Sequence, residues 1–317
     1  AVGRERWLES IPADLPEAAA LQAAVAVPEM DALLDGIFGN SAFLTQCMIR
    51  EPAFFAQILR DGLDDAFNRL MTAASALADR ALDEKTLMKE LRVIKRRAAL
   101  AVALGDLTRQ WPLLKITGAL SDTADHTLNA ATAHVLRALD AQGDIALADK
   151  TACCPNSGLV ILGMGKLGSR ELNYSSDIDL VLLFDHEKVD YRGKDAPQTT
   201  FSRIARNLVK ILSERTADGH VFRVDLRLRP DPASTPPAIS VAAAETYYEA
   251  MGQNWERAAM IKARVCAGDR KIGEEFLRFI KPFIWRKNLD FASIEDIHSI
   301  KRQIDRHYGG SEIAVAG

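Results

Sequence analysis

The sequence predicts an α+β protein in which helical segments lie on both sides of a small sheet. Apolar side chains recur at steps of three and four residues up to about residue 150, and again after Val241, as on one face of a helix. Between these segments lie short apolar runs and an eight-residue stretch of strict alternation, which are typical of strands. We therefore divide the chain into a helical N-terminal region (1–150), a sheet-containing core (151–240) and a helical C-terminal region (241–317).

Composition narrows the class of protein. The chain has 317 residues, 48% of them hydrophobic, with 40 basic and 43 acidic side chains and a net charge of −3. This balance excludes a basic surface that coats nucleic acid, and no apolar run reaches membrane-spanning length. Four cysteines without Cys-x-x-Cys spacing are typical of free thiols in a reducing cytoplasm. The chain lacks an initiator Met and ends without a closing element, so we expect a piece of a longer protein.

The N-terminal region carries the usual signals of helix starts and helix faces. Ser41 is a suitable N-cap, and Pro52 suits the first turn of the next helix. An amphipathic stripe further along comprises Leu87, Leu91, Ile94, Ala98 and Ala101. The basic cluster 95–97 on this helix is most simply a solvated face, with a partner-docking patch as the alternative. Residues 149–158 are expected to form a linker.

The core begins with a short buried strand at residues 159–162, followed by a glycine-rich turn and a second strand at 175–184. Residues 200–218 are then predicted to form a helix that ends at Gly219. The inner face of this helix comprises Phe201, Ile204, Leu208, Ile211 and Leu212. Such an order of strand, turn, strand and helix predicts a sheet covered by at least one helix.

Two aspartates stand at the start of the second strand. Strand side chains alternate between faces, so Asp177 and Asp179 point the same way and can hold one divalent cation between them. Mg²⁺ prefers carboxylate oxygens together with a substrate phosphate. Two adjacent carboxylates without a neutralising partner are unfavourable in a packed site unless a cation is present. The alternatives are a helix start capped by Ser176, or structural aspartates exposed at a strand edge.

A third aspartate, Asp225, lies on a predicted strand at residues 222–229. One face of this strand is wholly apolar, and the other carries Arg223, Asp225, Arg227 and Arg229. One aspartate among arginines suits a third metal ligand surrounded by guanidinium groups that bind phosphate. We expect the proline-rich loop 230–237 to end the sheet and the chain to return to helix after it.

The glycine-rich turn at residues 163–168 fits the dinucleotide-binding pattern G-x-G-x-x-G. That fold needs a crossover helix before the next parallel strand, and the eight residues 169–176 leave no room for one. A turn that approaches phosphate oxygens with Lys166 and Ser169 is the functional interpretation that remains. A plain structural turn is the alternative.

Together these motifs resemble a known family. A glycine-rich turn, Asp-x-Asp on one strand and a lone Asp on a later strand form the pattern of the polymerase β-type nucleotidyltransferases. Residues 162–180 (LGMGKLGSRELNYSSDIDL) look like the signature of the glutamine synthetase adenylyltransferases, and residues 223–230 (RVDLRLRP) look like their second hallmark. The resemblance extends to residues 39–44 and 285–291, so it covers most of the chain.

The resemblance implies both a fold and an activity. Members of this family are bifunctional cytoplasmic enzymes of nitrogen regulation with two nucleotidyltransferase domains, of which the N-terminal one removes AMP from a tyrosine of glutamine synthetase and the C-terminal one adds it. Residues 252–264 are similar to the N-terminal copy, so the expected reaction is phosphorolysis of AMP-tyrosine to ADP and free tyrosine. The expected partners are adenylylated glutamine synthetase, the signalling protein PII, and inorganic phosphate and ADP.

The resemblance also implies the site residues. Mg²⁺ or Mn²⁺ would be held by the catalytic residues Asp177, Asp179 and Asp225. The nucleotide and its phosphates would be bound by Gly165, Lys166, Gly168, Ser169, Ser176, Arg227 and Arg229. The same site would serve adenylyl transfer from ATP, which is the first alternative. A non-catalytic module that docks glutamine synthetase or PII is the second.

Overall fold

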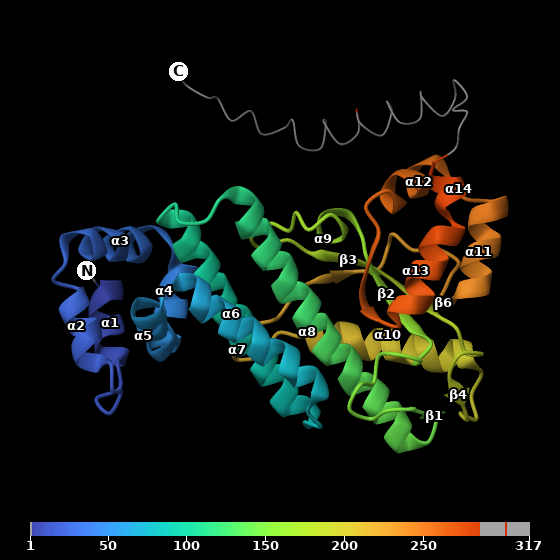
Figure 1. Ribbon diagram of the computed structural model, residues 1–317, viewed down its shortest axis with the longest axis horizontal. Helices are drawn as coiled ribbons and strands as arrows, with labels where there is room; N and C mark the ends of the chain where they lie inside the picture. The colour runs from blue at the N-terminus through green and yellow to red at the C-terminus, as the bar shows by residue number, and fades with distance from the viewer. Residues whose placement is uncertain (1, 286–301, 303–317) are drawn as a thin grey trace.

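The computed structural model describes residues 2–285 and 302 (Figure 1). Its N-terminal part is built mainly from helices, as predicted for residues 1–150. In chain order these are α1 (Val2–Ser10), α2 (Ala18–Ala24), α3 (Pro28–Asn40), α4 (Ala42–Arg50), α5 (Pro52–Asp61), α6 (Leu63–Ala76), the 3-10 turn η1 (Leu77–Asp79), α7 (Glu84–Leu107) and α8 (Leu113–Gln142).

The expected local signals are present at these helices. The Ser41 hydroxyl caps α4 by accepting a hydrogen bond from the N–H of Leu44 at 3.2 Å, and Pro52 opens α5. The predicted apolar stripe of α7 is buried along its whole length, from Leu87 to Ala101. Helices α6, α7 and α8 pack against one another, and this stripe belongs to the core that they share.

A mixed five-stranded sheet follows, in the order β5–β3–β2–β7 with β6 also paired to β3. Its strands are β2 (Leu159–Gly163), β3 (Ile178–Phe184), β5 (Val224–Asp225), β6 (Ala238–Ser240) and β7 (Arg264–Gly268). Strand β2 is antiparallel to β3 and β7, whereas β5 and β6 are parallel to β3. The antiparallel β2–β3 pair confirms that no crossover helix joins them. A separate ribbon pairs β1 (Ile145–Ala146) with β4 (Asp190–Tyr191).

Helices cover both faces of this sheet (Figure 1). On β3, Leu180 and Leu182 join the core shared with the N-terminal helices and α10 (Pro197–Ser213), whereas Val181 faces a second core. The second core is formed with α11 (Val241–Ala250), α12 (Asn254–Met260), α13 (Arg270–Phe279) and α14 (Lys281–Ile284). By the alternation of strand side chains, Asp179 lies on the same face as Val181.

The sheet extends further along the sequence than predicted. The proline-rich loop 230–237 does not end it, because β6 and β7 follow, and the segment after Val241 is therefore not wholly helical. Strand β7 has five residues, too few to show a periodicity that separates it from its helical neighbours. Its pairing with β2 makes it a strand, and that pairing joins segments about a hundred residues apart.

Three elements of the core are shorter than predicted, and the first is the strand expected at 175–184, which begins at Ile178. The strand expected at 222–229 is reduced to β5, because the Asp225 carboxylate accepts the N–H of Arg227 at 2.8 Å and turns the chain. Helix α10 ends at Ser213 rather than at residue 218, and Gly219 lies in a turn paired with Thr216. The buried Arg92 of α7 stabilises this irregular end by donating to the carbonyl oxygens of Ile211, Glu214 and Gly219.

The basic cluster 95–97 is not the solvated face that its composition predicted. Arg96 and Arg97 both donate to the carboxylate of Glu51, which is 4% exposed, with the Arg96 Nε at 2.8 Å. The Lys95 ammonium lies 3.9 Å from the centroid of the Phe222 ring. Glu51 lies between α4 and α5, 45 residues before Arg96, so a pattern of neighbouring charges does not reveal this pairing.

Part of the predicted C-terminal region lies outside the residues that the structure describes. Residues 286–291, which carry most of the C-terminal resemblance, lie outside the described residues, as does most of the region after Trp285. In the segments that the structure describes, no helix has the length and apolarity needed to span a membrane. All four cysteines are unpaired, as predicted.

Candidate active site

Three aspartates meet at one edge of the sheet. Asp179 of β3 stands in parallel register with Asp225 of β5, so their side chains leave the sheet on the same face. Asp177 lies two residues before Asp179, directly ahead of the strand, and the alternation of β3 places it on that face as well. The structure therefore brings the three predicted aspartates together.

The carboxylates act on one another electrostatically. Burial raises the pKa of Asp179, and the neighbouring carboxylates of Asp225 and Asp177 raise it further. The cations Arg227 and Lys166 oppose this rise only in part. Asp225 behaves differently, because its hydrogen bond with Arg227 lowers its pKa. The centre of the site is thus a partly buried carboxyl group surrounded by excess negative charge.

Two of the three carboxylates also bind an arginine. Arg223 is ion-paired with Asp177 and donates to the Ser175 carbonyl oxygen at 2.7 Å. The Arg227 Nε donates to Asp225 at 2.8 Å. The expectation that Asp177 and Asp179 have no neutralising partner is therefore wrong for Asp177, whereas Asp225 lies beside an arginine as predicted. Arg223 was not among the predicted site residues, although its place on the charged face of the 222–229 segment was a signal.

The two arginines predicted to bind phosphate differ in their surroundings. The Arg227 side chain is 84% exposed. Arg229 is half-buried and donates to the carbonyl oxygens of Leu226 and Pro232, both at 2.8 Å, and of Thr235 at 3.0 Å. Arg227 can therefore reach a bound anion by a side-chain rotation, whereas Arg229 holds the loop after β5 in place.

The glycine-rich turn forms a single helical turn, α9 (Gly165–Gly168), between β2 and β3. Gly165 has φ +51°, and a Cβ placed on it would lie 3.2 Å from the Asp179 Oδ2 atom. A Cβ on Gly168 would lie 1.9 Å from the Lys262 carbonyl oxygen. Gly165 therefore borders the aspartates, and Gly168 permits close packing against the segment that leads into β7.

The remaining predicted polar residues lie around this turn. Lys166 is exposed, and its charge is felt at Asp179. The Ser169 hydroxyl lies 3.0 Å from the Gly165 carbonyl oxygen and 2.9 Å from a carboxylate oxygen of Glu171. Ser176 is half-buried and directly precedes Asp177. Of these three, Lys166 is the one whose charge acts on the aspartate group.

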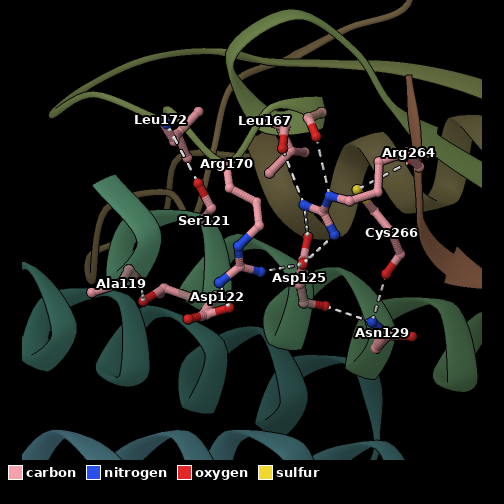
Figure 2. Close-up of polar contacts among 12 residues, drawn as sticks. Ala119, Ser121, Asp122, Asp125, Asn129, Leu167, Arg170, Leu172, Arg264 and Cys266 are labelled. Carbon is pink, nitrogen blue, oxygen red and sulfur yellow. Dashed lines mark hydrogen bonds and ion pairs between the residues drawn. The ribbon is translucent and has the colours of Figure 1, made fainter. Parts of the chain in front are cut away.

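Helix α8 holds the glycine turn in position (Figure 2). Arg264, the first residue of β7, donates to both carboxylate oxygens of Asp125 at 2.7 and 3.1 Å and to the Leu167 carbonyl oxygen at 3.0 Å. One turn further along α8, Asn129 donates to the Cys266 carbonyl oxygen at 2.8 Å. A bidentate carboxylate–guanidinium pair has a defined geometry, so it orients α9 relative to the sheet. No local sequence pattern predicted this pair, because its members are 139 residues apart.

The donor set suits a hard divalent cation. In the described part of the chain, no group of three or more His, Cys, Asp or Glu side chains is already arranged so that it could hold a metal ion. Asp177 and Asp225 nevertheless raise the pKa of Asp179 between them. Such a group of carboxylate oxygens is the kind of ligand set that Mg²⁺ or Mn²⁺ prefers. Binding there would require Asp177 and Asp225 to exchange their arginines for the cation.

Comparison with known proteins identifies relatives. Residues 32–279 match the family model described as glutamate-ammonia ligase adenylyltransferase. A bifunctional glutamine synthetase adenylyltransferase/adenylyl-removing enzyme of Rhizobium meliloti (strain 1021) is 50% identical over 285 residues, which is 88% of this chain and 29% of that protein. Proteins of the same name from Rhodopseudomonas palustris (strain HaA2) and Brucella suis biovar 1 (strain 1330) are 44% and 47% identical, over 98% and 90% of this chain.

The chain spans only part of these relatives. It covers 29% of the Brucella protein and 31% of the Rhodopseudomonas protein. The family model, in contrast, matches most of the chain and includes the three aspartates and the glycine-rich turn. We conclude that this chain belongs to the glutamate-ammonia ligase adenylyltransferase family.

Proposed function

We propose that this chain removes AMP from a tyrosine of glutamine synthetase by phosphorolysis. The observation that carries the proposal is the grouping of Asp177, Asp179 and Asp225 beside the glycine turn. The relatives are named for both adenylyl transfer and adenylyl removal. The similarity of residues 252–264 to the N-terminal copy of the family favours removal.

The finer fold assignment belongs to the same proposal. We assign the sheet to the polymerase β-type nucleotidyltransferases. This assignment is supported by the antiparallel β2–β3 pair, the single-turn helix between them, and the parallel addition of β5 that sets Asp225 beside Asp179. Cytoplasmic location and regulation by the PII protein are expected of a family member that acts on this substrate.

In the proposed reaction, an oxygen of inorganic phosphate forms a bond to the AMP phosphorus, and the bond from that phosphorus to the tyrosine oxygen breaks. The products are ADP and free tyrosine. Asp177, Asp179 and Asp225 would hold Mg²⁺ or Mn²⁺, which when bound stabilises the charge on the entering and leaving oxygens. A tyrosine hydroxyl has an unperturbed pKa of about 10, so its phenolate leaves without a dedicated general acid.

Other residues of the chain would bind and orient the phosphate groups. Lys166 is exposed beside the aspartates, and Arg227 is exposed and already acts on Asp179. Both cations can donate hydrogen bonds to phosphate oxygens by moving only their side chains. Arg264 and Asp125 would act as positioning residues, because they hold α9 against the sheet without reaching the aspartates themselves.

The direct test is formation of ADP from adenylylated glutamine synthetase and phosphate. We expect the chain to form ADP with Mg²⁺ or Mn²⁺ present, and we expect the Asp177→Asn variant to lose this activity while retaining its fold by circular dichroism. Turnover by Asp177→Asn equal to that of the wild type would refute the metal mechanism.

Parallel reactions separate the alternatives. AMP incorporation from ATP into unmodified glutamine synthetase, without ADP formation from the modified protein, would identify the chain as the transferase. Binding of glutamine synthetase or PII without either reaction, together with no heat of Mn²⁺ binding in calorimetry, would identify a docking module. Either result replaces the proposal with a defined alternative.

A further inference from the structure

A large cleft lies next to the aspartates and is not used by the proposed reaction. It has a volume of about 870 Å³ and is bounded by α4, α7 and the segments 174–175 and 215–221. Ligand pockets usually measure about 300 to 1,000 Å³, so this cleft has room for a molecule of nucleotide size. One wall is shared with the active site, because Ser175 lines the cleft and its carbonyl oxygen binds Arg223, the partner of Asp177.

One end of the cleft carries positive charge that the protein does not neutralise. Across residues 2–285 and 302, no carboxylate lies within ion-pair distance of Lys95. Its ammonium lies over the Phe222 ring in a cation–π contact. Arg96 uses two of its nitrogens on Glu51, and its buried Nη1 atom makes no hydrogen bond, with Asp218 3.6 Å away. Buried donors that make no hydrogen bond are uncommon in folded proteins, and the ion pair with Asp218 at 3.6 Å does not supply one.

The electrostatic environment of His220 shows the same excess of positive charge. Burial lowers the pKa of this histidine, and each charged neighbour that affects it lowers it further; these neighbours are Arg223, Arg215, Lys95 and Arg92. Arg92 is occupied by backbone carbonyls and Arg223 by Asp177. Lys95 and the exposed Arg215 therefore remain as the cations available to an anion in the cleft.

Lys95 has no evident structural task that would explain its charge. Burial lowers its pKa to about 8, so holding the ammonium in this place opposes folding. The packing of its alkyl stem would be retained in large part by an uncharged side chain of similar length, whereas the contact of its ammonium with the Phe222 ring would be lost. A charged group kept in a cleft against its own desolvation is the behaviour expected of a ligand-binding residue.

The rest of the cleft is apolar and partly open. Along α7, the side chains that follow Lys95 in the cleft are Ala99, Ala103 and Leu107. On the opposite walls, Phe43 is 61% exposed and Tyr174 is 47% exposed, with the Tyr174 hydroxyl anchored on Asp106 at 3.1 Å. Aromatic rings exposed inside a concave surface are typical of sites for ring-containing ligands.

We propose that this cleft binds a small organic anion in which a phosphate or carboxylate group is joined to an aromatic ring. The anionic group lies at Lys95, Arg215 and the Arg96 Nη1 atom, which makes no hydrogen bond and is ion-paired only with Asp218 at 3.6 Å. The ring lies against the apolar wall that includes Phe43. The site is separate from the aspartates and does not depend on the proposed phosphorolysis. It stands on the cleft and its uncompensated charge alone.

The test uses fluorescence titration with 1-naphthyl phosphate in a buffer with EDTA, which keeps divalent cations from the aspartates. We expect wild-type chain to bind this probe, and to bind inorganic phosphate or 1-naphthol at least tenfold more weakly, because each lacks one of the two groups. Titration with 1-naphthoate distinguishes a carboxylate-preferring site from a phosphate-preferring one.

Matched variants locate the binding. Lys95→Met should weaken binding at least tenfold, whereas Lys89→Met, which removes an equal charge from an exposed position of the same helix, should leave it unchanged. Arg215→Gln, at an exposed loop position, should weaken binding severalfold. Asp179→Asn should bind as well as the wild type, which distinguishes the cleft from the active site.

Thermal melting excludes loss of folding as the cause. The probe should raise the melting temperature of the wild type and of Lys89→Met but not of Lys95→Met, and Lys95→Met should itself melt no lower than the wild type. Equal binding by Lys95→Met and Lys89→Met, loss of binding in Asp179→Asn, or no binding by the wild type at millimolar probe would each overturn the proposal.

Discussion

The aspartate site and the basic cleft lie on either side of the Ser175–Arg223 contact and carry opposite excess charge. The aspartate site holds three carboxylates, and arginines pair with two of them. The cleft holds a cluster of cations, and Glu51 pairs with Arg96 and Arg97 but not with Lys95. Each site also holds a partly buried group without an ion-pair partner, which is Asp179 in the aspartate site and Lys95 in the cleft.

The two unpartnered groups are shifted toward their neutral forms for different reasons. The pKa of Asp179 is raised by burial and by two neighbouring carboxylates, whereas the pKa of Lys95 is lowered to about 8 by burial alone. Both shifts mean that the charged form opposes folding. The comparison indicates that each site is complete only with a ligand, a cation in one and an anion in the other.

The largest expected effect concerns the acidic side. Asp179→Asn should reduce ADP formation at least about 100-fold. Loss of a residue that only supports a metal ligand costs up to about 100-fold in metal affinity or activity, and loss of a proposed ligand should cost at least as much. Its melting temperature should not fall, because the substitution removes repulsion among the three carboxylates. Enzyme assay and thermal melting check both parts, with the exposed Asp65→Asn as the control that retains activity. A less stable but active Asp179→Asn would break the comparison.

The next largest effect is expected at Glu51, which neutralises Arg96 and Arg97 beside the cleft. Glu51→Gln should lower the free energy of unfolding by roughly 3 kcal/mol, because it leaves Arg96 and Arg97 without the buried carboxylate that pairs them. Urea unfolding measures the change. Glu275→Gln, at an exposed position of α13, is the control and should stay within about 0.5 kcal/mol of the wild type. A neutral Glu51→Gln would mean that solvent already screens this cluster.

A smaller effect of opposite sign is expected at Lys95. Lys95→Met should raise the free energy of unfolding at pH 7 by about 1 kcal/mol, the desolvation penalty less the lost ring contact. The folded pKa of about 8 lies below the unfolded value of about 10.4, so the penalty is fully present below pH 8 and disappears as the pH rises above 10.4.

Unfolding measured from pH 7 to 10 tests this sign. The free energy of unfolding of the wild type should approach that of Lys95→Met as the pH rises across this range. A difference between the two proteins that does not change with pH would contradict the lowered pKa of Lys95. Other charged groups face this lysine and remain the same in both proteins; they are Arg92 and Arg96 on α7, and Arg215, Asp218 and His220 in the loop.

The smallest stability effect is expected at the contact between the two sites. Arg223 and Asp177 are 54% and 49% exposed, so Arg223→Gln should change the free energy of unfolding by no more than about 0.5 kcal/mol. The freed Asp177 should raise Mn²⁺ affinity severalfold in calorimetric titration. A weaker Mn²⁺ affinity in this variant would show that Arg223 helps to form the cation site rather than competing with it.

Local patterns in the sequence predicted much of the fold and the acidic half of this comparison. The stripe from Leu87 to Ala101, the buried strand β2 and the apolar part of β3 up to Phe184 follow from spacing and alternation within a few residues. The short link between β2 and β3 correctly excluded a crossover helix. The spacing of two residues predicted that Asp177 and Asp179 share a face, although β3 itself begins at Ile178, just after Asp177.

Other features depended on contacts between distant segments and were missed. Strand β7 forms by pairing with β2, and α10 ends early where Arg92 takes its last carbonyls. The cluster 95–97 was expected in solvent because its carboxylate partner comes from another helix. The Arg264–Asp125 pair joins residues 139 apart in the sequence.

The sequence by itself therefore determined which segments are helix or strand and which acidic side chains can act together. Periodicity and short spacing encode these properties within one or two turns of chain. Only the tertiary structure decided which charges are neutralised and which are left for a ligand. Pairing and burial of charge depend on atoms that the fold brings close from far apart, so Lys95 and Asp179 acquire their shifted pKa values only in the assembled molecule.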